Sequence, residues 1–272
     1  MSAKSKKALS VLDRAVIVLF TMFLWLTSIM LPAVCIAQSE GFYHTQLEKT
    51  GIYAQVDENG VEQNRAYIYW VGGDPYQVAQ FSNEQLDTIV SHIIDYLFTD
   101  QESFALTMDN VLLNGQEQDG VEIFSETSVS HMVDVKELFS LVIVLTIVFA
   151  LLTVGLGVYI ILRRKHLARF IVKYSLLFYL GFLAAAGLFL GWVALDAKAN
   201  DTTFASQMWS NFHHILFPFQ ADKFSGSFFN DTLTWILSLD FFLAAVYTVL
   251  IIMAIIVAVW IACTVFFKRL YK

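Results

Sequence analysis

The chain has 272 residues, of which 57% are hydrophobic, and its mean hydropathy is +0.60. Soluble domains of this length are less apolar, so the composition indicates an integral membrane protein. The formal net charge of −7 argues against nucleic acid as a partner, because the phosphate backbone attracts basic proteins.

Four apolar runs are long enough to cross a membrane. A hydrocarbon core of about 30 Å needs about 20 helical residues, and a single segment satisfies its own backbone hydrogen bonds in lipid only as a helix. The runs cover residues 15–37, 139–162, 170–195 and 241–267. None alternates as a barrel strand does, so the predicted fold class is an all-α membrane protein with four transmembrane helices.

The distribution of charge predicts how the chain crosses the membrane. Basic residues concentrate in the tail 1–14, the short connection 163–169 and the tail 268–272, so the positive-inside rule places both termini and this connection in the cytoplasm. The two long connections, 38–138 and 196–240, carry most of the acidic residues and are expected outside. We therefore expect a multi-pass plasma-membrane protein whose first run is an uncleaved span.

The connection 38–138 is long enough for a small α+β extracellular domain. Its clearest element is 82–98, where Ser82 and Gln85 form a capping box and apolar residues then recur at helical spacing. The apolar stripe needs a partner, which is either the membrane surface or neighbouring strands. His92 falls on the polar side and is expected to face solvent.

Strands are predicted at 67–71 and 111–113, where aromatic and branched residues cluster. Asn59-Gly60 and Asn114-Gly115 are typical of hairpin turns, because asparagine and glycine tolerate the left-handed backbone conformation that such turns need. These turns support an antiparallel strand region beside the helix.

The connection 196–240 is unusually rich in aromatic residues, which are more typical of a membrane interface than of a solvated loop. It is therefore predicted to be an interfacial loop. It also contains the adjacent histidines His213 and His214. From the sequence alone, an aromatic belt with incidental histidines explains them as well as a functional role does.

The most informative stretch is 125–139, at the entrance to the second apolar run. If a helix starts at Ser125, His131 and Asp134 share one face, and the carboxylate can orient the imidazole. At 1.5 Å per residue His131 lies about 10 to 12 Å above the apolar run, at the depth of lipid ester bonds. The alternative is an ordinary helix start whose polar residues face water.

A metal site is the main chemical alternative, because His131, Asp134, His213 and His214 include enough donors for a zinc ion. Their spacing matches no H-E-x-x-H or comparable signature, so we expect neither a metal nor another cofactor. No Gly-x-Ser-x-Gly turn is present that would mark a serine nucleophile. A histidine acting as a general base is the favoured chemistry.

Short motifs now connect the chain to a known family. They are Phe124-Ser125-Glu126, Ser130-His131-Met132-Val133-Asp134-Val135-Lys136, Phe212-His213 and Asp231-Thr232-Leu233. With the four-span plan, they make the chain resemble the lipoprotein intramolecular transacylases of Gram-positive bacteria. The resemblance in organisation covers essentially the whole chain. Thr127-Ser128 and Ser238 depart from the family pattern, at the entrances to the second and fourth spans.

The resemblance implies an acyltransferase without a cofactor, acting at the outer leaflet among membrane lipids. Its substrate would be a diacylated bacterial lipoprotein, whose sn-2 acyl chain moves from the diacylglyceryl group to the α-amino group of the same cysteine, giving the lyso-form. It also implies His131 and His213 as the catalytic pair. Asp134 and His214 are expected to support them.

Two other classes remain open at this point. One is a non-catalytic four-span assembly or sensor protein, and the other is a metal-dependent membrane hydrolase. A transporter is disfavoured, because transporters place charged residues near the middle of the membrane. Among lysine, arginine and acidic residues, the four apolar runs contain only Lys173, which lies near the end of its run.

Overall fold

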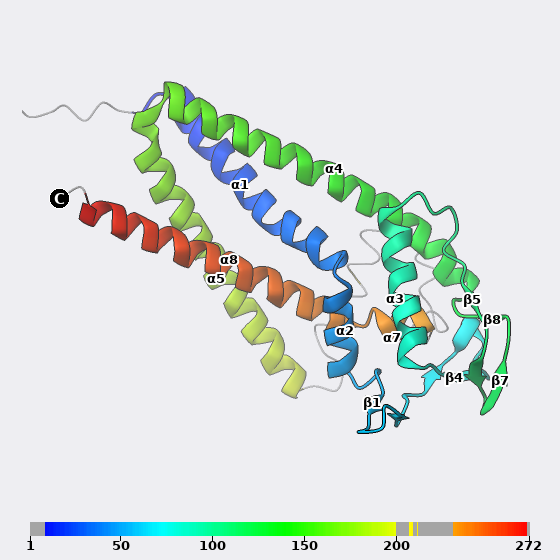
Figure 1. The fold of residues 1–272 in the computed structure, drawn as a ribbon. Coiled ribbons are helices and arrows are strands. Elements are labelled where there is room, and N and C mark those ends of the chain that lie inside the picture. The colour runs from blue at the N-terminus through cyan, green and yellow to red at the C-terminus, as the bar shows by residue number, and fades with distance from the viewer. Residues whose placement is uncertain (1–8, 200–206, 209–210, 212–230, 271–272) are drawn as a thin grey trace, which may run out of the picture. The chain divides into compact units, whose positions relative to one another are not determined.

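A computed structural model describes residues 9–199, 207–208, 211 and 231–270 (Figure 1). The fold is mostly helical, and four of its helices are long and apolar enough to cross a membrane. These helices are α1 (Val11–Ala37), α4 (Glu126–Arg163), α5 (Ala168–Ala199) and α8 (Leu239–Leu270). Each predicted apolar run lies within one of them, so the prediction of four membrane helices is confirmed.

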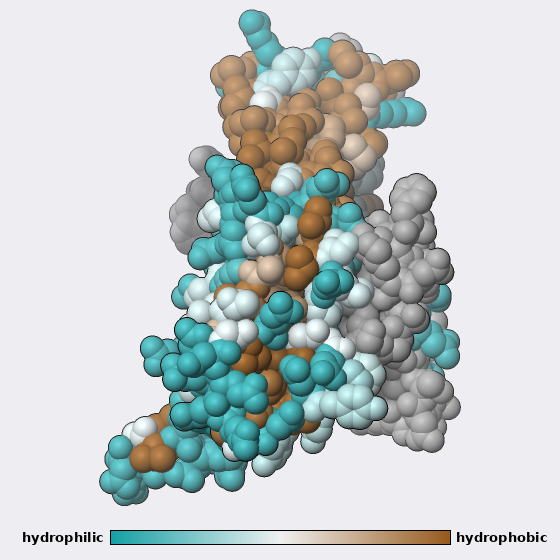
Figure 2. Space-filling view, turned by 90° about the vertical axis from the view of Figure 1, so that its right-hand side faces the viewer, coloured by the Kyte–Doolittle hydropathy of each residue, from teal (hydrophilic) through white to brown (hydrophobic). Residues whose placement is uncertain are grey.

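The chain divides into two compact units. The first comprises residues 1–33, 142–194 and 248–272, and the second comprises 34–141 and 195–247. Figure 2 shows apolar side chains gathered over the helices of the first unit and hydrophilic side chains gathered over the second. The first unit thus has the surface expected of a lipid-exposed helix bundle.

In the first unit, polar pairs join α1 to α5. The hydroxyls of Thr21 and Ser175 lie 2.7 Å apart, and those of Ser28 and Tyr179 lie 2.8 Å apart. A polar group in hydrocarbon needs a partner, so such pairs fix one helix against the next. They hold these two helices together along the bundle.

The second unit contains short helices and strands. Its other helical elements are α2 (Glu40–Lys49), α3 (Asn83–Phe98), α7 (Thr232–Ile236) and the 3-10 turn η1 (Val71–Gly73). The strands are β1 (Gln55–Val56), β2 (Glu62–Gln63), β3 (Ile68–Tyr69), β4 (Val78–Gln80), β5 (Thr107–Met108), β6 (Val111–Leu113), β7 (Gln116–Gln118) and β8 (Val121–Glu122). They pair antiparallel as β1-β2, β3-β4-β6-β7 and β5-β8. The predicted strand region is therefore present.

Both predicted hairpin turns are confirmed. Leu113 pairs with Gln116, so Asn114 and Gly115 form a two-residue turn, with φ angles of 51° and 80°. Positive φ at both positions is the geometry that selects asparagine and glycine. The other turn, at Asn59-Gly60, connects β1 to β2.

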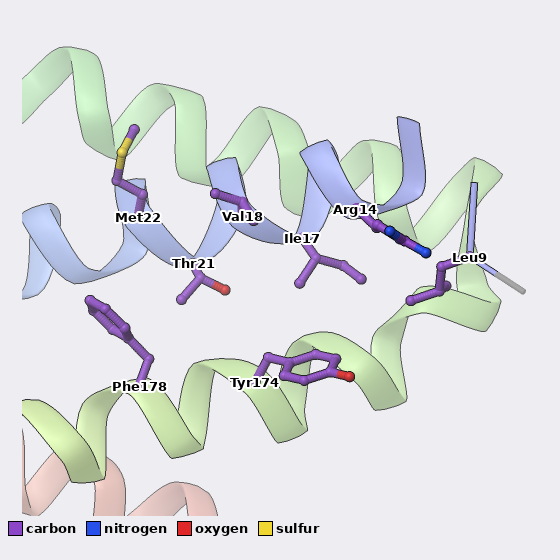
Figure 3. Close-up of a pocket in the computed structure, with 8 residues that line it drawn as sticks. All are labelled: Leu9, Arg14, Ile17, Val18, Thr21, Met22, Tyr174 and Phe178. Carbon is purple, nitrogen blue, oxygen red and sulfur yellow. The ribbon is translucent and has the colours of Figure 1, made fainter. Parts of the chain in front are cut away.

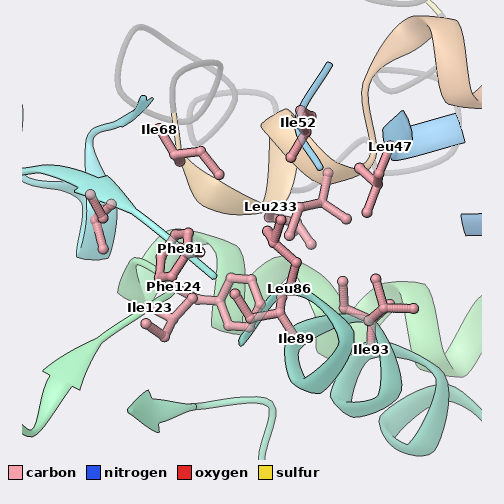
Figure 4. Packing of buried hydrophobic residues seen from close by; sticks show 14 of the residues in the cluster. Leu47, Ile52, Ile68, Phe81, Leu86, Ile89, Ile93, Ile123, Phe124 and Leu233 are labelled. Carbon is pink, nitrogen blue, oxygen red and sulfur yellow. The ribbon is translucent and has the colours of Figure 1, made fainter. Parts of the chain in front are cut away.

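Helix α3 begins and packs as its sequence predicts. Ser82 accepts a hydrogen bond from the backbone N–H of Gln85, whose side chain accepts one from the backbone N–H of Ser82, completing the capping box. Figure 4 shows Ile89 and Ile93 of α3 facing side chains from the strands and from α7. The apolar stripe is therefore buried within the unit by the strands, α2 and α7 rather than by a membrane surface.

The prediction for His92 is wrong. Its Nε2 lies 2.9 Å from the carbonyl oxygen of Phe104, its Nδ1 lies 3.3 Å from the amide nitrogen of Gln101, and its ring stacks on Phe124. The segment after α3 folds back over this histidine. Helical spacing alone could not show that cover.

The core of the second unit provides a direct test of this packing. Ile89 is fully buried, so Ile89→Ala leaves a cavity and should lower the free energy of unfolding by about 2 to 5 kcal/mol. Thr88→Ala is the matched control, because Thr88 is exposed and its hydroxyl donates to the carbonyl of Glu84 in its own helix. Thermal unfolding of the detergent-solubilised protein should show a midpoint several degrees lower for the first variant alone. Equal midpoints would contradict the assignment of α3 to the core.

Candidate active site

His131 lies on the buried face of α4, near its start. The helix begins there because the hydroxyl of Ser125 accepts a hydrogen bond from the backbone N–H of Ser128, at 3.1 Å, as an N-cap. His131 is only 6% exposed, and its neighbour Met132 belongs to the core of the second unit. The imidazole is thus placed by a packed helix rather than by a solvated one, which excludes the alternative of a helix start facing water.

A buried carboxylate ties this helix start to α7. Asp231 is fully buried, and its Oδ2 accepts hydrogen bonds from the backbone N–H of Ser125 at 3.2 Å and from its hydroxyl at 2.8 Å. The same oxygen accepts a hydrogen bond from the hydroxyl of Ser128. Its Oδ1 accepts the backbone N–H of Thr232 at 2.7 Å, which caps α7. One side chain therefore serves two helix starts that lie 106 residues apart in sequence.

Burial dominates the electrostatics of this carboxylate. Loss of solvent raises the pKa of Asp231 above its ordinary value of 3.8, although the hydrogen bonds from Ser128, Ser125 and Thr232 act in the opposite direction. Both helix starts also present positive dipole ends to the carboxylate. Because burial raises the pKa of Asp231 in the folded chain, the free energy of unfolding should depend on pH through this group.

A glycine pair allows the η1 turn to approach the same helix start. Gly73 has a φ of +82°, and a β-carbon placed on it would lie 2.6 Å from the β-carbon of Ser125. The neighbouring Gly72 also has positive φ, and its N–H donates to the carbonyl of Ile123. No other residue type fits at position 73, because it would clash with the N-cap of α4.

On the other side of His131, Lys136 joins α4 to the end of α3. Its ammonium donates to the carbonyl oxygens of Thr99 at 2.9 Å and Gln101 at 2.7 Å, and it lies 4.5 Å from the centre of the Tyr96 ring. The helix turn that carries His131 is therefore held at both ends. Such fixation suits a side chain whose orientation matters for its chemistry.

The other predicted site residues fall in different places. Asp134 is half-buried, one turn beyond His131, and makes no hydrogen bond or ion pair with any residue that the structure describes. His213 and His214 lie outside the described residues. The structure therefore positions His131, while the roles of Asp134, His213 and His214 stay predictions.

Comparison with known proteins identifies the family. The family model of the lipoprotein intramolecular transacylase Lit matches residues 16–242, which is most of the chain. The chain belongs to this family. It is therefore a membrane enzyme that transfers an acyl group within a lipoprotein molecule. The alternative of a non-catalytic assembly or sensor protein no longer applies. Comparison with curated proteins gives no match.

Solved structures of the lipoprotein intramolecular transacylase from Bacillus cereus share the fold. One is 16% identical and covers 96% of each chain, with a TM-score of 0.62. A variant in which arginine replaces a histidine is 14% identical over 96% of this chain and 95% of that one, with a TM-score of 0.59. A variant in which alanine replaces a histidine is 14% identical over 96% and 94%, with a TM-score of 0.57. At this identity the likeness concerns the architecture of the transacylase.

Sequence reasoning placed Asp231 in a family motif but gave it no role in the site of this transacylase. The available signal was an aspartate directly before Thr232 at a helix start, which is a capping pattern. Nothing local showed that the same carboxylate would also accept hydrogen bonds from Ser125 and Ser128. Among the described residues, no three histidine, cysteine or acidic side chains gather closely enough to hold a metal ion.

Replacing Asp231 should reveal its buried charge. Because its pKa is higher in the folded chain than in the unfolded one, the folded state holds the proton more tightly. Its contribution to stability is therefore full below the ordinary pKa and declines as pH rises through the raised value. Asp231→Asn stays neutral, so the midpoint of thermal unfolding should fall less steeply for this variant than for the unsubstituted protein as the pH rises above the ordinary pKa of 3.8.

The control is Asp240→Asn, which removes an exposed carboxylate in the first turn of α8. It should keep the pH dependence of the unsubstituted protein. If the midpoint of thermal unfolding depended on pH equally in Asp231→Asn and in the unsubstituted protein, burial would not raise the pKa of Asp231, and this account of the carboxylate would be wrong.

Proposed function

We propose that this transacylase moves the sn-2 acyl chain of a diacylglyceryl-cysteine onto the α-amino group of the same cysteine, with His131 as its general base. The observation that supports this proposal most is the buried position of His131. It lies on α4 between Ser128, which is hydrogen-bonded to Asp231, and Lys136, which is hydrogen-bonded to Gln101. Family membership supports the reaction class, and the sequence motifs support the residue. The product is the lyso-form of the lipoprotein.

The proposed chemistry needs a base and an acid but no enzyme nucleophile. An α-amine with a pKa of about 8 is largely protonated at neutral pH, so a neutral imidazole must first remove a proton. The amine nitrogen then attacks the ester carbonyl and the carbon–nitrogen bond forms. As the nitrogen gives a second proton to an imidazole, the carbon–oxygen bond of the glyceryl ester breaks. His213 is the second imidazole that we propose, and it returns a proton to the leaving alkoxide.

Orientation is the main contribution that we assign to the protein. Donor ester and acceptor amine belong to one substrate, so holding them as a near-attack conformer removes much of the barrier. A base attached to a mobile helix start would lose that advantage. We propose Asp231 as a positioning residue, because its bond to Ser128 fixes the turn directly before His131. Asp134 and His214 are proposed as supporting groups.

The proposed topology places this chemistry at the outer leaflet of the plasma membrane. It rests on the positive-inside rule, which assigns tails 1–14 and 268–272 and the connection 163–169 to the cytoplasm. Residues 38–138 then form an extracellular α+β domain, and 196–240 an interfacial loop. Lipoproteins anchored in that leaflet would reach His131 laterally, with their ester bonds at the matching depth.

Substitution of the two histidines tests the mechanism. His131→Ala and His213→Ala should each lower the rate of lyso-form production by about 10²-fold or more, because each removes one proton-transfer group. The assay follows a diacylated lipoprotein in proteoliposomes by mass spectrometry of its N-terminal peptide. Equal quantities of each folded variant are compared.

His44→Ala is the matched control, since the side chain of His44 is 47% exposed and pairs with Glu48 at the surface, where its ring also lies against Tyr53. This variant should retain the full rate. Unchanged acyl migration in both His131→Ala and His213→Ala would exclude the proposed base and acid, whatever the behaviour of the control.

A further inference from the structure

The first unit contains a groove that the acyl-transfer proposal does not use. It lies between α1 and α5 and has a volume of about 830 Å³ (Figure 3). Its walls are mainly apolar, with Val18, Met22 and Phe178 all partly exposed along it. The groove belongs to the membrane helices, so the molecules that reach it are lipids or other membrane helices.

One end of the groove is polar. Arg14 lines it, and its guanidinium makes no hydrogen bond or ion pair with any described residue, whereas the nearby Arg164 pairs with Asp13 at 3.5 Å. The hydroxyl of Tyr174 has no hydrogen-bond partner among the same residues. Figure 3 shows both polar groups directed toward the Leu9 end. The polar end therefore presents an unmatched positive charge and an available hydroxyl.

A second cation lies beside this end. The ammonium of Lys173 is 5.7 Å from the centre of the Tyr174 ring. Arg14 on the groove wall and Lys173 beside the Tyr174 ring supply two positive charges, which favour an anionic head group at the edge of a membrane. Arginine is well suited to such recognition, because its guanidinium matches the oxygens of a phosphate.

Deeper in the groove the polar groups are already satisfied. Thr21 lines it, but its hydroxyl lies 2.7 Å from that of Ser175 and both side chains are buried. From Arg14 to Met22, eight helical residues span about 12 Å, so an apolar chain could lie along α1. Charge at one end and apolar walls beyond it match the two parts of a phospholipid.

We propose that this groove binds one anionic phospholipid. Its phosphate contacts Arg14 and the hydroxyl of Tyr174, and one acyl chain lies against Val18, Met22 and Phe178. A second copy of the chain fits less well, because a helix packed over Arg14 would bury the guanidinium without a counter-charge. The described residues that line the groove belong to the first unit, whereas His131 belongs to the second, so we assign this lipid to a different site from the lipoprotein substrate.

The test measures lipid retention by the full-length protein with native mass spectrometry in detergent. Titrations use phosphatidylglycerol or phosphatidylcholine with identical acyl chains. The unsubstituted protein should retain phosphatidylglycerol preferentially, and Arg14→Gln should weaken its binding about fivefold, the loss expected for one arginine contact at a lipid surface. Val18→Trp should also weaken it, because the larger side chain occupies the groove while Arg14 remains.

Arg163→Gln is the matched control. Arg163 is an exposed arginine at the end of α4, in the same unit, and it does not line the groove. Its substitution should leave phosphatidylglycerol binding unchanged. Unchanged binding by Arg14→Gln, or an equal loss in Arg163→Gln, would overturn the proposal. So would a lipid-free dimer that Val18→Trp dissociates, since the groove would then hold a second copy.

Discussion

The carboxylate of Asp231 is the interaction on which the second unit of this transacylase depends. It joins the starts of α4 and α7 through Ser125, Ser128 and Thr232. Removing it would leave several buried donors without an acceptor, and each unsatisfied donor costs about 1 to 3 kcal/mol. Its burial is unfavourable for a charged group, so the hydrogen bonds that surround it are what make the arrangement stable.

The hydrogen bond between Asp231 and Ser128 also fixes the part of α4 that carries His131. Ser128 precedes His131 by one turn, and Lys136 follows it by little more than one turn, so the imidazole lies on a segment fixed at both ends. In an intramolecular acyl transfer, the enzyme contributes mainly by holding the ester and the amine in a reactive orientation, and it needs no nucleophile of its own. A helix fixed in this way, with a base on its buried face, is a structure that serves that need.

Local patterns predicted much of the fold, and contacts distant in sequence account for the rest. Hydrophobic run length predicted the spans, and Ser82 with Gln85 predicted the start of α3, because these signals act over a few residues. His92 was mispredicted because Phe104 and Gln101 cover it from a later segment. The role of Asp231 required a contact with Ser128 across 103 residues, which no periodicity reveals. For the candidate site, the motif around His131 identified the residue but not what holds it.

A double-mutant cycle tests the central claim, that Asp231 acts on acyl transfer through His131. Single-turnover rates of lyso-form production would be compared for the unsubstituted protein, Asp231→Asn, His131→Ala and the double variant. If Asp231 positions His131, Asp231→Asn should slow transfer about tenfold when His131 is present and have almost no effect when it is absent, because residues that act as a unit are not additive. The same tenfold loss in both backgrounds would contradict this account.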